Sequence, residues 1–597
     1  RDNAEVDDGW LCDRGRYGFE MFADAKRIDG PRLKGGAAAG WEQAIAAAAA
    51  GLRAAGGTSA AIVGDASNEE GYLVQRLLRE ALGSPHVDSR PSRGPGREAL
   101  VRLAQPDISA KVRDIDDAGV ILVLGTDPLH SSPILDLRIR KAIRRNGARL
   151  AVATERPTAL DGGAEAIARY APGEGAHFLS ELASAVGGAE NVATPLAESL
   201  RDAGRVVVIW GERIARDGDG VGALLDLAAA LDLAGSDGSG LLEIPDTTNA
   251  RGLREAGCLP DAGPGLSETT SVPFVTSGMT NGTLVGKSTE EIRAALESGE
   301  LKSIVLFGVD PLRDFPDSLA WARALAAADH VVAFSMFETL TTAAADVVFP
   351  IETHAEKDGT VTHPDGRLQR VRPSASRPGD IRPNLQVLAD LSTALGNDTG
   401  INSQPTAFAA LANEVPFYAD VNDAKIGGRG IRWQDTEAAS AVPDRDGVVG
   451  AASPDATQRG GEADSAGGDG ASRGVSGEAA PTTLPDSNGG SPKLALGTYR
   501  DLWAGSITEL NPPLKFLEPQ QRAELSPADA DRLGLKHGDE VEVAGNGAVV
   551  LAKVAIRERQ QEGVVFLIEG TAADNANGLL NGGPVEVEIT KLSEISV

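Results

Sequence analysis

The chain has 597 residues, a formal net charge of −29 and a pI of about 4.7. This length allows about three or four domains with sizeable cores. The acidity argues against nucleic acid or an anionic membrane as a direct partner. No apolar run approaches the roughly 18–20 residues of a bilayer-spanning helix, so we expect no direct membrane insertion. The only cysteines, Cys12 and Cys258, exclude a disulfide framework and fit a reducing compartment.

The first 35 residues are polar and rich in Gly and Arg, with a few scattered aromatic side chains. They hold too little apolar material for a core of their own, so we expect this segment to be the truncated end of a domain that begins upstream. Cys12 lies here in the sequence WLCDRGR, beside two arginines and a glycine. Cationic and backbone N–H groups near a sulfur favour the thiolate, which is the form that binds metal. On composition alone, a lone cysteine is more often a bystander.

Between residues 36 and 435, short apolar runs alternate with helical patterns of 10–15 residues. The strands are expected at Ala60–Gly64, Gly119–Pro128, Arg149–Ala153, Arg205–Gly211, Ser303–Pro311 and His330–Phe334, and the helices at Trp41–Ala55, Asn68–Leu82, Ile134–Asn146, Val221–Leu233 and Ser318–Ala328. This alternation is typical of parallel sheet covered by helices on both faces. The sequence therefore predicts an α/β fold for this region.

Two of the expected strands end in the same motif, Gly-x-Asp-Pro, at residues 125–128 and 308–311. Open α/β sheets bind ligands at the carboxyl ends of their strands, which makes both loops candidates for a ligand site. The same residues also form a good turn. The sequence leaves both interpretations open.

A strongly polar loop spans Thr353–Gln369, after the apolar run ADVVFP. Because it lies between apolar strands, we expect it to face a partner or a cleft. His354, Glu356 and His363 lie close together in this loop and could be drawn as a metal site. Exposed loop residues are the better interpretation of all three.

Residues 436–492 are dominated by Gly, Ser, Ala and Asp and hold almost no aromatic side chain. Such a composition cannot bury enough apolar surface to fold, so we predict a disordered linker. Residues 493–597 contain several β-type runs and a short helix that starts at Ser526 with Pro527 in its first turn. We expect this unit to be a compact β-barrel.

Several common catalytic motifs are absent from the sequence. It contains no Walker A or G-x-G-x-x-G segment, which leaves phosphoryl transfer and nicotinamide binding without support. It also lacks C-x-x-C, H-E-x-x-H and G-x-S-x-G motifs. We therefore name no catalytic acid, base or nucleophile.

Four segments of the chain resemble one superfamily. They are WLCDRGRYGF at 10–19, TNARGLREAGCLPDAGPG at 248–265, the ADVVFP–EKDGT–GRLQ stretch within 345–369, and the C-terminal unit with ELSPADA at 524–530, LGLKHGD at 533–539 and Gly570. The chain resembles the molybdopterin oxidoreductase superfamily. The N-x-R-G-L-x-E-x-G segment is closer to the G subunit of NADH-quinone oxidoreductase (respiratory complex I) than to molybdenum enzymes generally. The resemblance implies molybdopterin-oxidoreductase-like α/β subdomains over 36–435 and a barrel similar to molybdopterin-dinucleotide-binding domains over 493–597.

This resemblance gives Cys12 a role. In the superfamily a [4Fe–4S] cluster is held by three closely spaced cysteines and a fourth in an L-C-x-x-G-R context, which Cys12 matches; the other three would lie upstream of Arg1. The implied activity is electron transfer from NADH through flavin and iron–sulfur clusters toward quinone, in a proton-pumping translocase. The implied partners are other peripheral-arm subunits, and the implied location is cytoplasmic, on the inner face of the cell membrane. This fragment would be mostly scaffold, without a catalytic site of its own.

Molybdenum members of the superfamily supply a Cys, selenocysteine or Ser to the metal shortly after their first helix. The corresponding segment here, residues 86–97, has no cysteine. Ser89 or Ser92 could be argued as ligands, but serine in a Gly/Pro/Arg-rich loop is usually a turn residue, so molybdopterin is not expected. Two alternatives stay open: a molybdopterin-dependent oxidoreductase of the formate dehydrogenase or nitrate reductase type, and a structural module without a cofactor.

Overall fold

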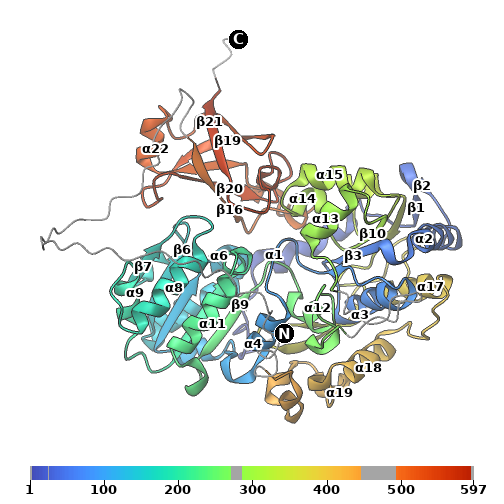
Figure 1. Ribbon diagram of the computed structural model, residues 1–597, viewed down its shortest axis with the longest axis horizontal. Coiled ribbons are helices and arrows are strands. Elements are labelled where there is room, and N and C mark those ends of the chain that lie inside the picture. The colour runs from blue at the N-terminus through green and yellow to red at the C-terminus, as the bar shows by residue number, and fades with distance from the viewer. Residues whose placement is uncertain (1–2, 25, 270–284, 445–492, 593–597) are drawn as a thin grey trace, which may run out of the picture.

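The computed structural model describes residues 3–24, 26–269, 285–444 and 493–592 of the chain. Two α/β domains lie side by side, and a β-barrel from the C-terminal region sits over their junction (Figure 1). The α/β fold with parallel sheets and a terminal barrel is as the sequence predicts. The C-terminal unit contacts both sheet domains. The candidate site lies at its contact with the domain of residues 120–244.

The first domain is built on a seven-stranded sheet in the order β2-β1-β12-β11-β10-β3-β4. Its strands are β1 (Arg32–Leu33), β2 (Ala37–Ala38), β3 (Ser59–Val63), β4 (Val87–Asp88), β10 (Ser303–Phe307), β11 (His330–Ser335) and β12 (Val347–Pro350). The five strands from β12 to β4 are parallel. Antiparallel β1 and β2 come from the N-terminal segment, so that segment completes an edge of this sheet.

Helices cover both faces of the seven-stranded sheet, as the alternating pattern requires. Side chains of β10 divide between two clusters: Val305 and Phe307 pack against α2 (Trp41–Ala55), α3 (Asn68–Arg76) and α17 (Asn384–Ala394). Ile304 and Leu306 pack against α13 (Thr289–Glu297) and α15 (Ser318–Ala327). Burial of alternate side chains on opposite faces explains why the strand is apolar without interruption.

The second domain is a five-stranded, fully parallel sheet that is inserted in the sequence between β4 and β10. The order is β7-β6-β5-β8-β9, with β5 at Val120–Leu124, β6 at Arg149–Thr154, β7 at Ala166–Arg169, β8 at Val206–Gly211 and β9 at Gly240–Ile244. Helices α8 (Gly175–Val186), α9 (Thr194–Leu200) and α11 (Gly220–Ala230) cover one face, and α7 (Pro133–Lys141) covers the other. The predicted α/β region thus contains two separate helix-covered sheets. It also contains a small antiparallel sheet of β13 (Gly359–Thr362), β14 (Arg367–Val371) and β15 (Ile431–Arg432).

The C-terminal unit is a closed barrel in the order β16-β20-β17-β19-β18-β21. Its strands are β16 (Leu494–Arg500), β17 (Arg522–Leu525), β18 (Glu540–Gly545), β19 (Ala548–Ile556), β20 (Val564–Glu569) and β21 (Glu586–Lys591). The predicted helix is α22 (Pro527–Arg532), and the Ser526 side chain accepts a hydrogen bond from the Asp529 N–H at its start. Closure pairs every edge strand, so the barrel leaves no open sheet edge.

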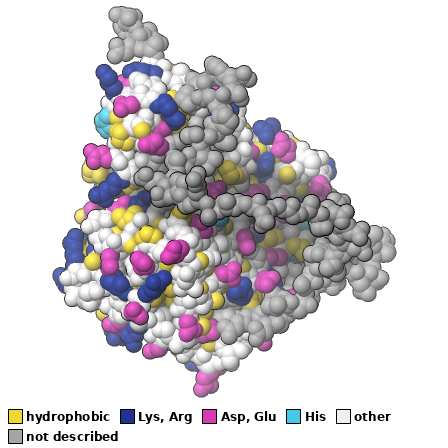
Figure 2. Space-filling model, turned by 60° about the vertical axis from the view of Figure 1, so that its left-hand side comes forward, with side chains coloured by type: hydrophobic (Ala, Val, Ile, Leu, Met, Phe, Trp, Pro, Cys, Tyr) yellow, Lys and Arg dark blue, Asp and Glu magenta, His cyan; other side chains and the backbone are white. Residues whose placement is uncertain are grey.

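The predicted linker, residues 436–492, lies mostly outside the described residues. Its first nine residues are described, and they include the short helix Glu437–Ala441 with a buried Ala439. On the face shown in Figure 2, acidic and basic side chains are interspersed rather than gathered by sign. Among the residues that the structure describes, no helix has the length and apolar character that a membrane crossing requires.

Candidate functional site

One cleft lies where the five-stranded sheet meets the barrel. In the order β7-β6-β5-β8-β9 the chain changes direction between β5 and β8, and such switch points place ligands at the strands' carboxyl ends. The cleft is lined from the loops after β5, β6 and β8 and from barrel strands β16 and β20, by Gly125, Thr126, Asp127, His130, Ser131, Thr154, Glu155, Arg156, Thr158, Glu212, Arg213, Thr498, Tyr499, Arg500 and Phe566. It contains the first Gly-x-Asp-Pro loop, whose Gly125 has a φ of 57°. Its cavity measures about 30 Å³, which is room for about two waters.

Two arginines that follow β8 face the barrel across this cleft. Arg213 donates from Nη2 to Glu569 Oε1 at 2.9 Å and from Nη1 to Thr498 Oγ1 at 3.1 Å. Arg216 donates from Nη1 to the same Glu569 oxygen at 3.3 Å and binds Asp246 through two parallel hydrogen bonds of 3.0 Å. The Glu569 side chain is only 3% exposed. Burial works to raise the pKa of Glu569, but Arg216 and Arg213 outweigh it and hold that pKa well below its usual range.

A third arginine, Arg156 after β6, is paired with another barrel carboxylate. Its Nη2 donates to Glu524 Oε2 at 3.0 Å, and its guanidinium lies 3.8 Å from the centre of the Tyr499 ring. Arg557 donates to the other oxygen of Glu524 at 2.7 Å. Burial would raise the pKa of Glu524, but Arg156 and Arg557 lower it overall. Of these three arginines on the sheet side, only Arg156 keeps a buried nitrogen, Nε, without a hydrogen-bond partner.

The cleft also contains three carboxyl groups whose pKa is raised, because burial disfavours their charged form. Burial raises the pKa of Glu155, and burial together with Asp246 raises the pKa of Glu212 to about 7. Burial also raises the pKa of Asp127, which caps the short helix α6 (Pro128–Ser131) by accepting from the Leu129 N–H. The cleft is therefore a poor environment for additional negative charge.

The second Gly-x-Asp-Pro loop ends β10, on the other sheet, so the structure does not bring the two loops together. The switch point of the seven-stranded sheet lies between β3 and β10, and the loops after these strands bind each other: Asp65 donates from its backbone N–H to the Gly308 carbonyl at 2.9 Å. Arg313, just after this loop, is paired with Glu509 of the C-terminal unit, with one hydrogen bond of 2.9 Å. Direct contact between the loops closes this crevice.

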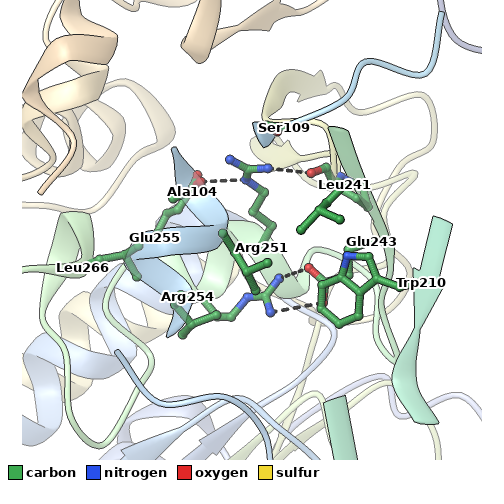
Figure 3. A pocket seen from close by; sticks show the side chains of 12 residues that line it. Ala104, Ser109, Trp210, Leu241, Glu243, Arg251, Arg254, Glu255 and Leu266 are labelled. Atoms are coloured by element: carbon green, nitrogen blue, oxygen red, sulfur yellow. Dashed lines mark hydrogen bonds and ion pairs between the residues drawn. The ribbon is translucent and has the colours of Figure 1, made fainter. Parts of the chain in front are cut away.

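A second pocket lies at the seam of the two sheet domains and is lined by the N-x-R-G-L segment (Figure 3). Arg254 points at Glu243 of β9 and binds both of its carboxylate oxygens. Arg251 donates to Glu255 at 2.8 Å and to the Pro364 carbonyl at 2.6 Å. These contacts join α12 (Ala250–Glu255) to the neighbouring strand and loop, so the segment fixes how the two domains meet.

Cys12 lies at the start of α1 (Asp13–Tyr17), where its sulfur accepts from the Gly15 N–H at 3.4 Å. The N-terminal segment around it reaches all three bodies of the molecule. Arg138 of the five-stranded domain donates to the Val6 carbonyl at 3.1 Å, and Arg14 donates to the Leu502 carbonyl of the C-terminal unit at 3.1 Å. Figure 1 accordingly shows α1 in the middle of the molecule. Cys12 itself is half-buried, and exposed apolar side chains surround it in the sequence: Trp10, Leu11, Tyr17 and Phe19.

The segment predicted to be a polar loop facing a partner or cleft is instead largely buried, and it contains strand β13 and the start of its antiparallel partner β14. Lys357 forms an ion pair of 2.8 Å with Glu70, and the two side chains are 7% and 2% exposed. Glu70 also accepts from the Ser67 N–H in the capping box at the start of α3. The loop thus wraps the first turn of α3 and satisfies its charges internally, which the alternation of polar and apolar runs did not reveal.

The three loop residues that could be drawn as a metal site have separate surroundings. His354 packs edge-on against Phe22, and His363 lies 2.8 Å from Asp365. Glu356, expected to be exposed, is buried and binds Arg27 at 2.8 Å. Within the described part of the chain, no cluster of three or more His, Cys, Asp or Glu side chains is arranged to hold a metal ion.

The buried Glu69 of the same region gives a pH prediction. Burial raises its pKa to about 7, against hydrogen bonds from Thr360 and Gln404 that favour the anion. A folded-state pKa above the unfolded value stabilises the protein at low pH and loses that contribution as pH rises through the folded pKa. We expect stability, measured by thermal unfolding, to fall between about pH 5 and pH 8 more steeply in the parent than in Glu69→Gln. The exposed Glu42→Gln variant should keep the parental slope.

The segment compared with molybdenum ligands is tightly bound to its neighbours. Ser89 and Ser92 are both buried, at 5% and 6% exposure. Asp88 binds Arg90 through two hydrogen bonds of 2.8 and 2.9 Å and accepts from the Thr289 N–H at 3.0 Å. The Ser92 hydroxyl is buried without a partner.

Comparison with known protein families identifies the family to which this chain belongs. The sequence model of the molybdopterin oxidoreductase family matches residues 27–394, which is more than half of the chain. The chain belongs to the molybdopterin oxidoreductase family. A molydopterin dinucleotide binding domain model matches residues 494–590, the barrel of this family member.

Individual proteins of known sequence or structure are also similar to this chain. The NADPH-Fe(3+) oxidoreductase subunit alpha of Geobacter sulfurreducens is 29% identical over 99% of this chain and 71% of its own length. The NADH-quinone oxidoreductase G subunit of Mycobacterium tuberculosis is 31% identical over 68% of this chain and 51% of its own, so the match spans about half of that relative. The acetylene hydratase of Pelobacter acetylenicus has the same fold, with a TM-score of 0.65, 13% identity, and coverage of 98% of this chain and 94% of its own.

Family membership raises the question of whether a pterin dinucleotide fits the cleft. Its diphosphate would need unpaired cationic donors, yet Arg213, Arg216 and Arg156 are bound to Glu569, Asp246 and Glu524. The residues present therefore do not fit the group. The sequence reasoning missed these arginines, although Arg213 and Arg216 follow the end of a buried strand, a position that could have marked them.

Proposed function

We propose that the chain is part of an electron-transfer subunit of the G type in an NADH-quinone oxidoreductase. Cys12 would be one ligand of a [4Fe–4S] cluster, and the rest of the fragment would serve as scaffold. The observation that carries this proposal is the position of Cys12: a half-buried sulfur beside a backbone N–H donor. Its segment is bound to the five-stranded domain and the C-terminal unit, and it continues to Arg27, which donates to the Ile351 carbonyl of the seven-stranded domain. Hydrogen bonds to a cluster's sulfurs and a fixed protein shell set its potential.

The proposed partners are other peripheral-arm subunits, with location on the cytoplasmic face of the membrane through the complex. The exposed Trp10, Leu11, Tyr17 and Phe19 support a covered surface next to Cys12, since these side chains are 44–61% exposed. Similarity to the mycobacterial G subunit supports the same assignment.

The test is metal content of the full-length gene product, purified anaerobically, with an EPR spectrum of the reduced protein. Cys12→Ser is expected to lose about four irons and one EPR signal relative to the parent, since four thiolates hold such a cluster. Cys258→Ser is the matched control. Cys258 is fully buried, its thiol donates to the Gly71 carbonyl at 3.2 Å, and burial raises its pKa to about 12. Iron content that is the same in both variants would contradict the proposal, and stoichiometric molybdenum in the parent would favour the pterin-dependent alternative.

A further inference from the structure

The barrel meets the sheet domains through arginine–carboxylate pairs at the edge where a ligand would bind. Each pair joins an arginine just beyond a strand's carboxyl end to a carboxylate from the C-terminal unit: Arg156 to Glu524, Arg213 and Arg216 to Glu569, and Arg313 to Glu509. The pattern repeats on both sheets. A carboxylate bound to a guanidinium takes N–H donors and neutralises positive charge that a phosphate of similar geometry would otherwise use.

We propose that Glu569 and Glu524 act as built-in anions, which take the arginines that a dinucleotide's diphosphate would need and fasten the barrel to the five-stranded sheet instead. The cleft is then a closed domain junction with a latent diphosphate site. This inference goes beyond the proposed function and does not depend on it.

The arginine–carboxylate pairs are buried, which strengthens their hydrogen bonds. The Glu569 and Glu524 carboxylates are 3% and 2% exposed, and their arginine partners on the sheet side are 15–17% exposed. Charge-assisted hydrogen bonds are strong in such water-poor surroundings. Because both carboxylates belong to the same folded barrel, no second molecule has to be captured, and the translational and rotational freedom of a separate ligand is not lost.

The small volume of the cleft and its carboxylates both fit a site that the barrel's side chains already fill. The cavity of about 30 Å³ takes about two waters, and the buried, unpaired Thr126 Oγ1 and Arg156 Nε are two atoms that such waters could satisfy. Glu155 and Glu212 line the same cleft, so an incoming diphosphate would meet carboxylates as well as arginines. A diphosphate could enter only if the barrel's carboxylates gave up their partners.

The experiment removes the built-in anions together with the volume that they occupy. In phosphate-free buffer without divalent cations, inorganic pyrophosphate is titrated calorimetrically into the parent and into the Glu524→Ala/Glu569→Ala double variant. The double variant is expected to bind pyrophosphate at least about tenfold more tightly than the parent, since it regains charge-assisted donors. Pyrophosphate should also raise the melting temperature of the double variant and leave that of the parent unchanged.

A matched control carries the same change of charge. Glu586→Ala/Glu588→Ala removes two exposed carboxylates of β21 in the same barrel and should bind pyrophosphate as weakly as the parent. Adding Arg156→Gln and Arg213→Gln to the double variant should abolish the gain, which assigns the binding to this cleft. If the double variant does not fold, Glu524→Ala alone frees Arg156 and should show a smaller gain. The proposal is overturned if the parent binds pyrophosphate as tightly as the variants, or if folded variants gain no affinity.

Discussion

Replacing Glu569 by alanine is expected to destabilise the junction between the barrel and the five-stranded domain by about 3–5 kcal/mol. The change leaves the Arg213 guanidinium largely buried without its carboxylate, and a buried charge without a partner costs far more than the intact pair contributes. Arg216 would keep Asp246, so Arg213 should account for most of the loss. Because a chain with several domains need not unfold in one step, the measurement is native-state hydrogen exchange of the β20 backbone N–H groups.

The matched control for this prediction is Glu588→Ala. Glu588 lies on strand β21 of the same barrel but is exposed, so its loss should leave exchange of β20 unchanged. A double variant, Glu569→Ala/Arg213→Leu, should recover part of the loss, since neither charge is then stranded. Equal protection in Glu569→Ala and the parent would show that the pair does not hold the junction.

The local elements of this fold could be predicted from the sequence. The helix Trp41–Ala55 begins and ends at the expected residues, because an alanine-rich run bounded by glycines decides both. The strand Val120–Leu124 was recognisable as buried on both faces, since its apolar run has no polar interruption. Such features depend on neighbours in the sequence, which the sequence displays directly.

Long-range pairing could not be predicted in the same way. The sequence suggested parallel sheet but not its division into two, nor that β10 would lie between β11 and β3. The pair Arg213–Glu569 joins residues 356 positions apart. The position of Arg213 after a buried strand could have marked it as a candidate, but it does not identify Glu569 as its partner, because only the docking of the barrel brings the two together and removes them from water.

The polar segment Thr353–Gln369 was also misinterpreted because its partners are distant in the sequence. Its charges suggested a partner or cleft, yet Lys357 and Glu356 find their partners within the fold. A buried ion pair and an exposed charged loop have the same composition. The role of Cys12 stays a prediction, because its neighbourhood at residues 10–19 lies before residues 27–394, which the family model matches.

Replacing Lys357 by methionine is expected to destabilise the seven-stranded domain by about 3–5 kcal/mol. Methionine fills much of the same volume, so the loss comes from the Glu70 carboxylate, which stays buried without its cation. Glu70 would keep hydrogen bonds from the Ser67 N–H and the Asn384 amide, each 2.6 Å long, and these limit the loss without neutralising the charge. Hydrogen exchange of the β3 backbone N–H groups would report the change.

An exposed ion pair of the same chain serves as the control for the buried Lys357–Glu70 pair. Lys34 binds Asp346 at the same distance of 2.8 Å, but the Lys34 side chain is 78% exposed. Because water and salt screen an exposed pair, Lys34→Met should change stability little. Adding Glu70→Gln to Lys357→Met should recover most of the lost stability, since no buried charge is then left unpaired. If the Lys357 and Lys34 variants lost equal stability, burial would not be what gives the Lys357–Glu70 pair its effect.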